Sequence, residues 1–315
     1  MTNFFTVVKE VAAKYPKNIC FAEGEQTYGE VWRLAQARAA ALRARGVKKG
    51  DVVGILSKNS PEWCITFTAI LSVGALALVL DSNLRADMYR EMLAHVNTKI
   101  LYTSAMFASE DYGVPQLSIE AADPYAAFEP EEKAEGSDLA MLLYTSGTTG
   151  NPKVVPLTHD NIIKTTQACI KHISAGPEDM FLTILPLYHV YGLVAGFWGG
   201  FLCGAALVFQ NSLKGTDILN TLAKYPITVF SAVPQLWEIF FDQIAKKIKN
   251  ESKFKYALFM FVLKHAPSFR HVGLGKFLDK LFYPIHKAFG LKLRILLCGG
   301  SRLGWRYCLY YKYMG

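Results

Sequence analysis

The sequence predicts an α/β fold built from layered, mostly parallel sheets with flanking helices. Three observations support this class. Helical and strand-like segments alternate along the chain, the loops between them are short, and the strands are apolar on both faces, as buried parallel strands are. The composition agrees, since 51% of the 315 residues are hydrophobic and 19% are charged. This balance excludes a disordered chain, a collagen-like chain and a small disulfide-stapled scaffold.

The first half of the chain alternates between predicted helices and predicted strands. Thr27 and Glu30 form a capping box that opens a helix, and Gly46 ends it. Ser60 and Pro61 start another helix, because Ser is a favoured N-cap and Pro fits the first helical turn. In addition, we expect strands at 52–56, 75–80, 99–103 and 139–144, helices at 60–73 and 86–96, and a loop at 81–83.

Two runs without charged residues, 63–80 and 180–213, are long enough to cross a membrane. The first passes from helix to strand at Gly74, and the second is interrupted by Pro186 and by several glycines. A helix, a glycine break and a buried strand in succession are typical of a parallel α/β sheet. We therefore interpret both runs as core and expect no membrane-spanning segment.

The positive charge is concentrated in one segment. The net charge is +8, and residues 245–294 carry twelve Lys and Arg against Glu251 and Asp279, with aromatic residues between them. Three interpretations are open: a patch that contacts a membrane surface, a solvated basic helix pair, or a contact for the phosphate groups of a soluble ligand or partner. No nucleic-acid-binding motif accompanies the charge, so no nucleic-acid partner is expected.

The cysteines and the first residues bear on the compartment. The chain has no C-x-x-C motif and no His at metal-ligand spacing, so free thiols in a reducing compartment and no metal site are expected. The first residues lack the basic region of a secretory signal. We expect a cytoplasmic protein, with a peripheral position on the inner membrane surface as a variant of that expectation. The six cysteines are Cys20, Cys64, Cys169, Cys203, Cys298 and Cys308.

The most informative segment follows an acidic linker at 121–138 and the strand at 139–144. Its two glycines allow the backbone to approach an anion, its hydroxyl groups are donors, and Lys153 supplies a cation for outer phosphates. It is not a Walker loop, since the Gly-Lys-Ser/Thr ending is missing. We therefore predict a polyphosphate-binding loop at Thr145, Ser146, Gly147, Thr148, Thr149, Gly150 and Lys153.

This loop resembles the signature phosphate loop of the adenylate-forming (AMP-binding) enzymes, which include the acyl-CoA synthetases. Other segments occur in the order of that family and are most similar to its long-chain fatty acid–CoA ligases. They are 50–63, 80–84, the Pro-Leu-Tyr-His segment at 185–192, the Val-Pro-Gln-Leu-Trp-Glu stretch within 230–238, and the Gly-Gly turn at 298–303. The resemblance covers essentially the whole chain.

The resemblance implies roles for particular residues. Lys153 and His189 are the implied catalytic residues, and ATP, Mg²⁺ and coenzyme A are the implied cofactors. The phosphate loop would hold ATP and stabilise departing pyrophosphate. The backbone of Gly299, Gly300 and Ser301 would pass along the adenine. The acid substrate would contact Tyr188, His189, Tyr191, Gly192, Val233 and Pro234.

The resemblance also implies an architecture. Residues 1–315 would form the large N-terminal domain of an acyl-CoA synthetase, incomplete and without the C-terminal lid domain, with subdomains near 1–175 and 176–315. The family's Tyr-Gly-x-Thr-Glu segment would begin after Gly315. We therefore expect a fragment of a longer ligase or a natural truncation that is weakly active or inactive alone.

The implied function is ATP-dependent activation of a fatty acid, or another carboxylic acid, to an acyl-adenylate and then to acyl-CoA. One alternative is an aryl-acid ligase or a ligase for an acyl-carrier protein in the same family. Another is a non-catalytic remnant that binds nucleotide or acyl chain without turnover.

Overall fold

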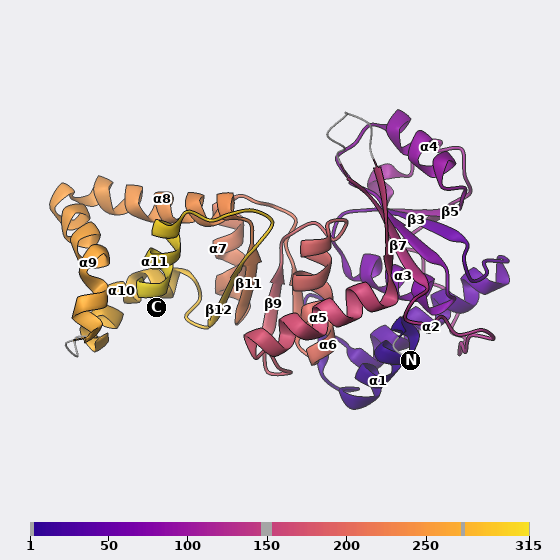
Figure 1. Ribbon diagram of the computed structural model, residues 1–315, viewed down its shortest axis with the longest axis horizontal. Helices are drawn as coiled ribbons and strands as arrows, with labels where there is room; N and C mark the ends of the chain where they lie inside the picture. Colours follow the sequence, from indigo (N-terminus) through magenta and orange to yellow (C-terminus); the bar gives the residue numbers. More distant parts are fainter. Residues whose placement is uncertain (1–2, 146–152, 272–274, 315) are drawn as a thin grey trace. The chain divides into compact units, whose positions relative to one another are not determined.

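The computed structural model describes residues 3–145, 153–271 and 275–314. Two compact units divide the chain, Met1–Asn211 and Ser212–Gly315, here called unit 1 and unit 2. In Figure 1 the colours follow the sequence, so unit 1 runs from indigo to salmon and unit 2 from orange to yellow. The predicted α/β class is confirmed, since both units combine helices with parallel strand pairs.

A six-stranded sheet forms one part of unit 1, in the order β6-β5-β3-β4-β7-β8. Every neighbouring pair is parallel except β7 and β8, which are antiparallel. The bounds are β3 Val52–Leu56, β4 Leu76–Val79, β5 Thr98–Thr103, β6 Gln116–Ser118, β7 Leu139–Thr145 and β8 Lys153–Thr158. The parallel order explains why β4 reads as a continuous apolar run, because all four of its residues are buried.

The helices beside this sheet begin at the caps that the sequence predicts. Helix α2 (Tyr28–Ala44) begins with the capping box of Thr27 and Glu30, and α3 (Pro61–Ser72) begins at the N-cap Ser60. Ten consecutive residues of α3 are buried, which accounts for the uncharged run at 63–80 without a membrane. The remaining elements are α4 Ala86–His95 and the 3₁₀ turn η1 Ala105–Phe107.

A second strand group of unit 1 has the order β9-β10-β1-β2. Strand β10 is parallel to both β9 and β1, so the start of the chain joins a segment near residue 200. Its elements are α1 Phe4–Lys14, β1 Ile19–Phe21, β2 Gln26–Thr27, α5 His159–Ile173, β9 Met180–Thr183, the π-helix η2 Gly192–Trp198, α6 Gly199–Cys203 and β10 Ala206–Phe209.

The two units meet in sequence at residue 211, whereas the sequence suggests subdomains divided near residue 175. The difference arises because β9 and β10 follow residue 175 but pair with each other and with β1, in unit 1. The subdomain boundaries stay a prediction.

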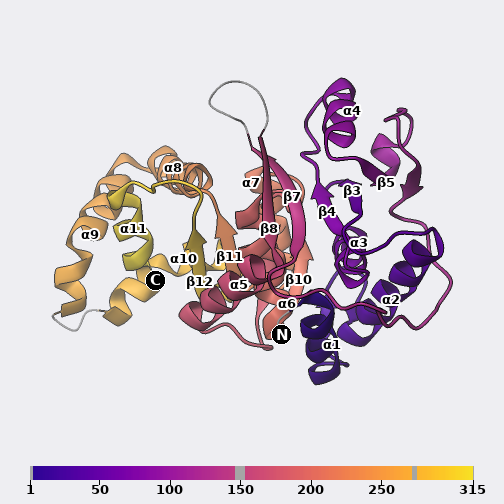
Figure 2. The ribbon, with the colours of Figure 1, turned by 45° about the vertical axis from the view of Figure 1, so that its right-hand side comes forward.

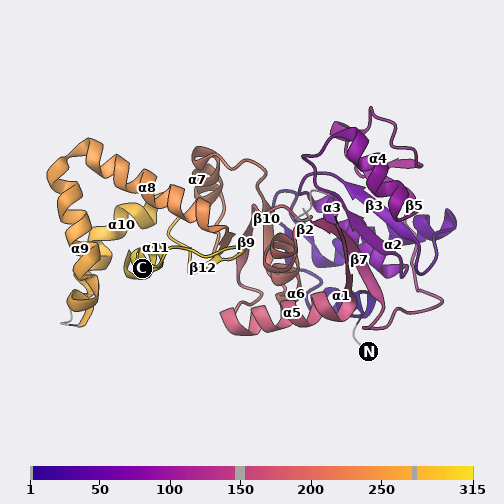
Figure 3. The same cartoon turned by 45° about the horizontal axis from the view of Figure 1, so that its top comes forward.

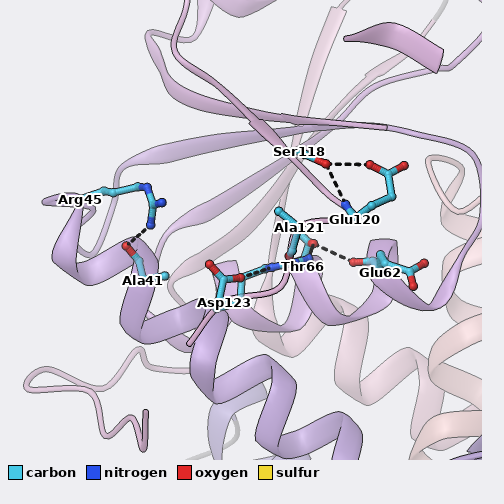
Figure 4. A network of polar contacts seen from close by, with 9 residues as sticks. Ala41, Arg45, Glu62, Thr66, Ser118, Glu120, Ala121 and Asp123 are labelled. Atoms are coloured by element: carbon cyan, nitrogen blue, oxygen red, sulfur yellow. Dashed lines mark hydrogen bonds and ion pairs between the residues drawn. The ribbon is translucent and has the colours of Figure 1, made fainter. Parts of the chain in front are cut away.

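Hydrogen bonds attach the first residues of the acidic linker at 121–138 to unit 1. The buried guanidinium of Arg38 in α2 donates from Nε to Asp123 (2.9 Å) and from Nη2 to the carbonyl of Ala121 (2.6 Å). Thr66 in α3 accepts from the same guanidinium and donates to the carbonyl of Glu62. Figure 4 shows Ala121 and Asp123 of the linker beside Thr66 of α3. The charge of Arg38 is thus buried with an ion-pair partner and hydrogen-bond acceptors.

Unit 2 contains one parallel strand pair and five helices within its described residues. Strands β11 and β12 pair in register, with Ala232 beside Cys298. Helices α8 and α9 meet at a bend, and α10 and α11 lie in the angle between them (Figures 2 and 3). The bounds are α7 Gly215–Lys224, β11 Val229–Ala232, α8 Pro234–Glu251, α9 Lys253–His271, α10 Gly275–Ala288, β12 Ile295–Cys298 and α11 Trp305–Met314.

Both uncharged runs are core elements, as the sequence predicts. Residues 63–80 belong to α3 and β4, and residues 180–213 contain β9, η2, α6 and β10. Within the part of the chain that the structure describes, no helix combines the length and the apolar character that crossing a membrane requires.

Candidate functional site

The ends of the predicted phosphate loop lie side by side. Thr145 is the last residue of β7, Lys153 is the first of β8, and the two are register partners in the antiparallel pair. Both side chains are exposed. The chain therefore leaves and re-enters the sheet at one point, with a hydroxyl and an ammonium there. The predicted residues Ser146, Gly147, Thr148, Thr149 and Gly150 lie outside the described residues.

A tyrosine anchors the strand that leads into this loop. The Tyr144 hydroxyl donates to the carbonyl of Met92 (3.0 Å) and lies 3.1 Å from Nδ1 of His95. Partial burial raises the pKa of Tyr144 above its usual value, so the hydroxyl keeps its proton. Residues at the end of α4 thereby fix the position at which the loop begins.

A buried asparagine holds the predicted Pro-Leu-Tyr-His segment. Asn59 Nδ2 donates to the carbonyl of Leu185 (2.8 Å), and Asn59 Oδ1 accepts from the backbone N–H of Leu187 (3.0 Å). Asn211 Nδ2 in turn donates to the backbone carbonyl of Asn59 (3.0 Å). One amide thus satisfies a donor and an acceptor of the segment, and this pairing fixes its backbone from a position far away in sequence.

A glycine sets the tight turn after that segment. The backbone N–H of His189 donates to the carbonyl of Pro186 (3.1 Å), and the N–H of Leu193 donates to the carbonyl of His189 (2.9 Å). A Cβ atom on Gly192 would lie 2.2 Å from the carbonyl oxygen of Pro186, so only glycine fits. The chain then continues as the π-helix η2, a rare form that is frequent at functional sites.

Tyr188 and His189 occupy the turn itself. The Tyr188 hydroxyl accepts a hydrogen bond from Nδ2 of Asn83 (2.9 Å), and Asn83 also donates to the Asp81 carboxylate. Burial, together with the Asp81 carboxylate, raises the pKa of Tyr188 well above its usual range. The His189 ring lies 4.6 Å from the Tyr188 ring, and His189 is exposed. Tyr188 is therefore a neutral, fixed side chain, and the accessible imidazole is beside it.

The other two predicted segments meet in unit 2. Val233 is the N-cap of α8 and Pro234 its first residue, directly after β11. The backbone N–H of Gly299 donates to the carbonyl of Ala232 (3.4 Å), and the Val233 side chain is the nearest neighbour of a Cβ built on Gly300. Gly300 has φ +86°, a conformation that favours glycine. Residues 233–234 and 299–300 therefore share one edge of the strand pair, next to the exposed Ser301.

An apolar cavity of about 480 Å³ lies in unit 2, near that edge. Trp237, Leu296, Cys298 and Leu303 are among its lining residues, and Arg294 and Lys312 also line it. The indole of Trp237 donates to the carbonyl of Leu297 (3.1 Å), which holds the ring against β12. The volume falls within the range of about 300–1,000 Å³ that is usual for small-molecule sites.

The predicted residues therefore form three groups. Thr145 and Lys153 form one and residues 188–192 form another, both within unit 1, while residues 233–234 and 299–301 form the third within unit 2. Asn59 and Asn83 are residues that the sequence analysis missed. Asn59 lies three residues after the end of β3, and Asn83 lies four residues after the end of β4. Polar residues that follow parallel strands are the signal that could have found them.

The described side chains at these positions suit the binding of anions. Among them no group of three or more His, Cys, Asp or Glu side chains could hold a metal ion. The donors at the loop ends are a hydroxyl and an ammonium, which suit phosphate oxygens. The accessible imidazole of His189 and the fixed hydroxyl of Tyr188 suit a carboxylate.

Comparisons with known proteins show which family the sequence resembles. A family model described as AMP-binding enzyme matches residues 8–308. Long chain acyl-CoA synthetase 4 of Arabidopsis thaliana is 25% identical over 96% of this chain and 53% of its own length. The 2-succinylbenzoate–CoA ligase of Bacillus velezensis is 30% identical over 68% of this chain and 45% of its own length. The chain spans about half the length of these curated relatives.

A solved structure supports the fold. The inhibitor-bound N-terminal domain of FACL13 from Mycobacterium tuberculosis superposes with a TM-score of 0.75, covering 99% of this chain and 73% of that one at 21% identity. At this identity the likeness concerns the fold alone. The family model, in contrast, covers nearly the whole sequence, and on that ground the chain belongs to the family of AMP-binding enzymes.

Proposed function

We propose that this chain takes part in the ATP-dependent activation of a carboxylic acid, first to an acyl-adenylate and then to an acyl-CoA thioester. The observation that carries the proposal is the register pairing of Thr145 with Lys153, which places a hydroxyl and an ammonium at the base of residues 146–152. That segment is rich in Gly, Ser and Thr, a composition suited to cradling a polyphosphate.

In this proposal each predicted group has one task. Lys153 binds the β- and γ-phosphates of ATP and neutralises the charge that develops on departing pyrophosphate. The hydroxyl and backbone donors of the loop bind the same oxygens. The backbone at Gly299 and Gly300 lies along the adenine, since a glycine lets the chain approach a ring face closely.

His189 is proposed as the residue that orients the acid. A carboxylate oxygen of the substrate attacks the α-phosphorus of ATP, the bond from that phosphorus to the bridging oxygen breaks, and pyrophosphate leaves. In the second step a thiolate attacks the acyl carbon and AMP leaves. Holding the carboxylate beside His189 and the neutral Tyr188 supplies position, and Lys153 supplies charge neutralisation on the phosphates. Position and charge neutralisation dominate the rate of phosphoryl and adenylyl transfer.

The described residues fit ATP better than they fit an independent metal site. Mg²⁺ would arrive with the nucleotide, since no described cluster of side chains could hold it alone. Mg²⁺ supplies charge neutralisation on the phosphates. Coenzyme A is the proposed thiol, and an acyl-carrier protein is the alternative acceptor.

The proposed acid is a long-chain fatty acid. The cavity beside Trp237 supports this, because its lining is mostly apolar and an alkyl chain gains free energy in proportion to the apolar surface that it buries. An aryl acid is the second candidate, favoured by the 30% identity with a relative named as a 2-succinylbenzoate–CoA ligase. The free cysteines support the cytoplasm as the proposed compartment.

The phosphate-loop assignment is tested by comparing two nucleotides. Wild type, Lys153→Ala and the matched exposed-lysine control Lys171→Ala are titrated calorimetrically with MgATP and with AMP. Loss of Lys153 should weaken MgATP binding roughly 10- to 100-fold, since a hydrogen bond to a charged group contributes about 1.5–3 kcal/mol. AMP lacks the β- and γ-phosphates, so its affinity should be unchanged. Equal binding of MgATP by all three proteins would show that the assignment is wrong.

The acid is tested by competition between palmitate and benzoate. Cys298→Phe places a ring in the cavity, and Cys169→Phe, at an exposed position of α5, is the matched control. Palmitate should bind wild type and the control but not Cys298→Phe. If benzoate binds and palmitate does not, the second candidate replaces the first.

A further inference from the structure

Helices α9 and α10 bury one face each in unit 2. Their buried residues belong to a cluster with Phe241 of α8 and Met314 of α11. Phe259 of α9 and Phe282 of α10 meet edge to face within it, with ring centroids 6.1 Å apart. The core thus accounts for the apolar residues on one side of each helix. It does not account for the exposed apolar residues on the other sides.

The second side of α9 is an exposed apolar stripe. Phe254, Leu258 and Phe261 are spaced by four and three residues, so they lie along one side of the helix. Their exposed fractions are 77%, 45% and 54%. Lys253, Lys255 and Lys264 are exposed on the same helix. The Phe261 ring lies 4.5 Å from the His265 ring of the same helix, yet about half of its surface stays exposed. Rings that are this accessible bury little apolar surface in the fold.

Helix α10 repeats the arrangement. Phe277 is 59% exposed, Leu281 is 38% exposed, and the exposed Pro284 continues the line. Next to this stripe, Lys276, Lys280 and Lys287 share a second side of the helix with the half-exposed Tyr283. An apolar stripe beside a lysine stripe is typical of helices that lie in a membrane interface.

The charge on these helices identifies the partner by its chemistry. Residues 245–294 carry twelve Lys and Arg, and Glu251 and Asp279 are their only acids. Glu251 is already paired with Lys255 at 3.4 Å. A soluble polyanion would account for the lysines but not for the exposed rings, and a solvated surface would not gather them into stripes. An anionic lipid surface accounts for both, because it offers phosphates above an apolar interior.

We propose that α9 and α10 bind the surface of an anionic lipid bilayer. The rings of Phe254, Phe261 and Phe277 enter the boundary between headgroups and acyl chains, and the lysines contact lipid phosphates. The chain lies on the bilayer and does not cross it. This inference goes beyond the proposed ligase function and does not depend on it, because it rests on surface residues of unit 2 and not on nucleotide or acid binding.

The first test is sedimentation of the 315-residue chain with lipid vesicles. One set contains phosphatidylcholine with phosphatidylglycerol, and the other contains phosphatidylcholine alone. The chain should bind the anionic vesicles, bind the neutral ones much more weakly, and be released by high salt, which screens the lysines. Failure to bind the anionic vesicles, or equal binding to both, would overturn the proposal.

Matched variants locate the contact. The triple substitution Lys276→Gln, Lys280→Gln, Lys287→Gln should weaken binding roughly 100-fold. The reason is that each lysine near an anionic surface raises the binding affinity by a factor of about five. The control is the triple substitution Lys17→Gln, Lys133→Gln, Lys171→Gln, which removes the same charge from exposed positions in unit 1. Equal losses in the two triple variants would show a general charge effect and contradict the proposed surface.

The aromatic stripe is tested separately. Phe254→Ser with Phe277→Ser should weaken binding roughly tenfold or more, since apolar burial supplies part of the affinity. Met106→Ser, at a residue 62% exposed in unit 1, is the control and should have no effect. If the ring variant binds like wild type and soluble polyphosphate displaces it completely, the surface binds phosphates without lipid, and the proposal fails.

A gain of signal complements these losses. Brominated lipids should quench the tryptophan fluorescence of Phe254→Trp more than that of the wild-type chain. The wild-type chain measures the background from its five natural tryptophans. No added quenching would place residue 254 outside the bilayer and contradict the insertion of α9.

Discussion

Two regions of the molecule place polar and aromatic side chains in opposite ways. In unit 1, Asn59 and Asn83 hold the backbone of residues 185–187 and the Tyr188 hydroxyl with hydrogen bonds of 2.8–3.0 Å. In unit 2, α9 and α10 leave large rings exposed beside lysines. The first region is arranged inward, to fix the geometry of a small site. In the second region the rings are exposed to solvent. They would bury apolar surface only if a partner covered them.

Because of this contrast, substitutions in the two units should affect different properties, namely fold stability in one and binding in the other. A change in the hydrogen-bonded region should alter the stability of the fold, because it leaves buried groups without partners. A change on the exposed helices should alter binding and leave stability nearly constant.

The largest effect is expected for Asn59→Ala. The substitution leaves the buried carbonyl of Leu185 and the N–H of Leu187 without their partner, and each unsatisfied group costs about 1–3 kcal/mol. Unit 1 should lose about 2–4 kcal/mol, measured by urea unfolding followed by tryptophan fluorescence. Asn250→Ala, at an exposed position of α8, should change stability by less than about 0.5 kcal/mol. Equal effects of the two variants would contradict the contrast between the units.

A pH effect of about 3 kcal/mol is expected from His159. Burial lowers the pKa of this imidazole to about 4, an effect that the nearby Asp138 and Asp160 carboxylates only partly oppose. Its Nδ1 accepts a hydrogen bond from the backbone N–H of Phe4 (3.3 Å), so the folded state keeps the ring neutral.

The sign of that effect follows from where the proton binds. Because the folded pKa lies below the unfolded value of about 6.5, the stability is complete above pH 6.5 and declines as the pH falls toward 4. The free energy of unfolding, measured across this range, should fall by about 3 kcal/mol more in wild type than in His159→Gln. Parallel pH profiles for the two proteins would show that His159 carries no such stability.

A smaller effect is expected for Tyr188→Phe. The substitution removes the acceptor for Asn83 Nδ2 but keeps the ring, so the loss should be about 1 kcal/mol. Tyr125→Phe, at a residue 67% exposed, is the control and should change stability by less than about 0.5 kcal/mol. A Tyr188 variant as stable as wild type would mean that the loop at 81–83 does not depend on this contact.

The smallest effect is expected for Phe254→Ser in unit 2. At an exposed fraction of 77%, the ring has little apolar area to lose from the folded state, so stability should change by less than about 0.5 kcal/mol. The thermal unfolding midpoint measures this directly. A clear loss of stability would mean that Phe254 packs within the fold, and it would weaken the case for a binding surface.

Local features were the ones that the sequence could predict. The N-caps Thr27 and Ser60 act on residues within one helical turn, so their helices begin where expected. The strand at 52–56 was also predicted with the bounds that it has in the structure, because its apolar run ends at polar residues on both sides.

Features that depend on distant residues could not be predicted in the same way. Asn59 binds Leu185 across 126 positions, and nothing near Asn59 specifies that partner. The antiparallel direction of β8 depends on its pairing with β7, which an extended pattern alone does not contain. The sequence predicted that the glycines at 192–204 interrupt a helix. In η2, Gly192 instead lets the backbone pass close to the Pro186 carbonyl, where a Cβ atom would not fit.

The proposed function requires that the chain holds a site for an acyl-adenylate. The most direct measurement is calorimetric binding of a stable palmitoyl-sulfamoyl-adenosine analogue, compared with AMP alone and palmitate alone. The analogue should bind roughly 100-fold or more tightly than either part, because one molecule contacts the backbone at Gly299 and Gly300 and fills the cavity beside Trp237. An analogue that binds no more tightly than AMP would contradict the account and leave a nucleotide site without an acid site.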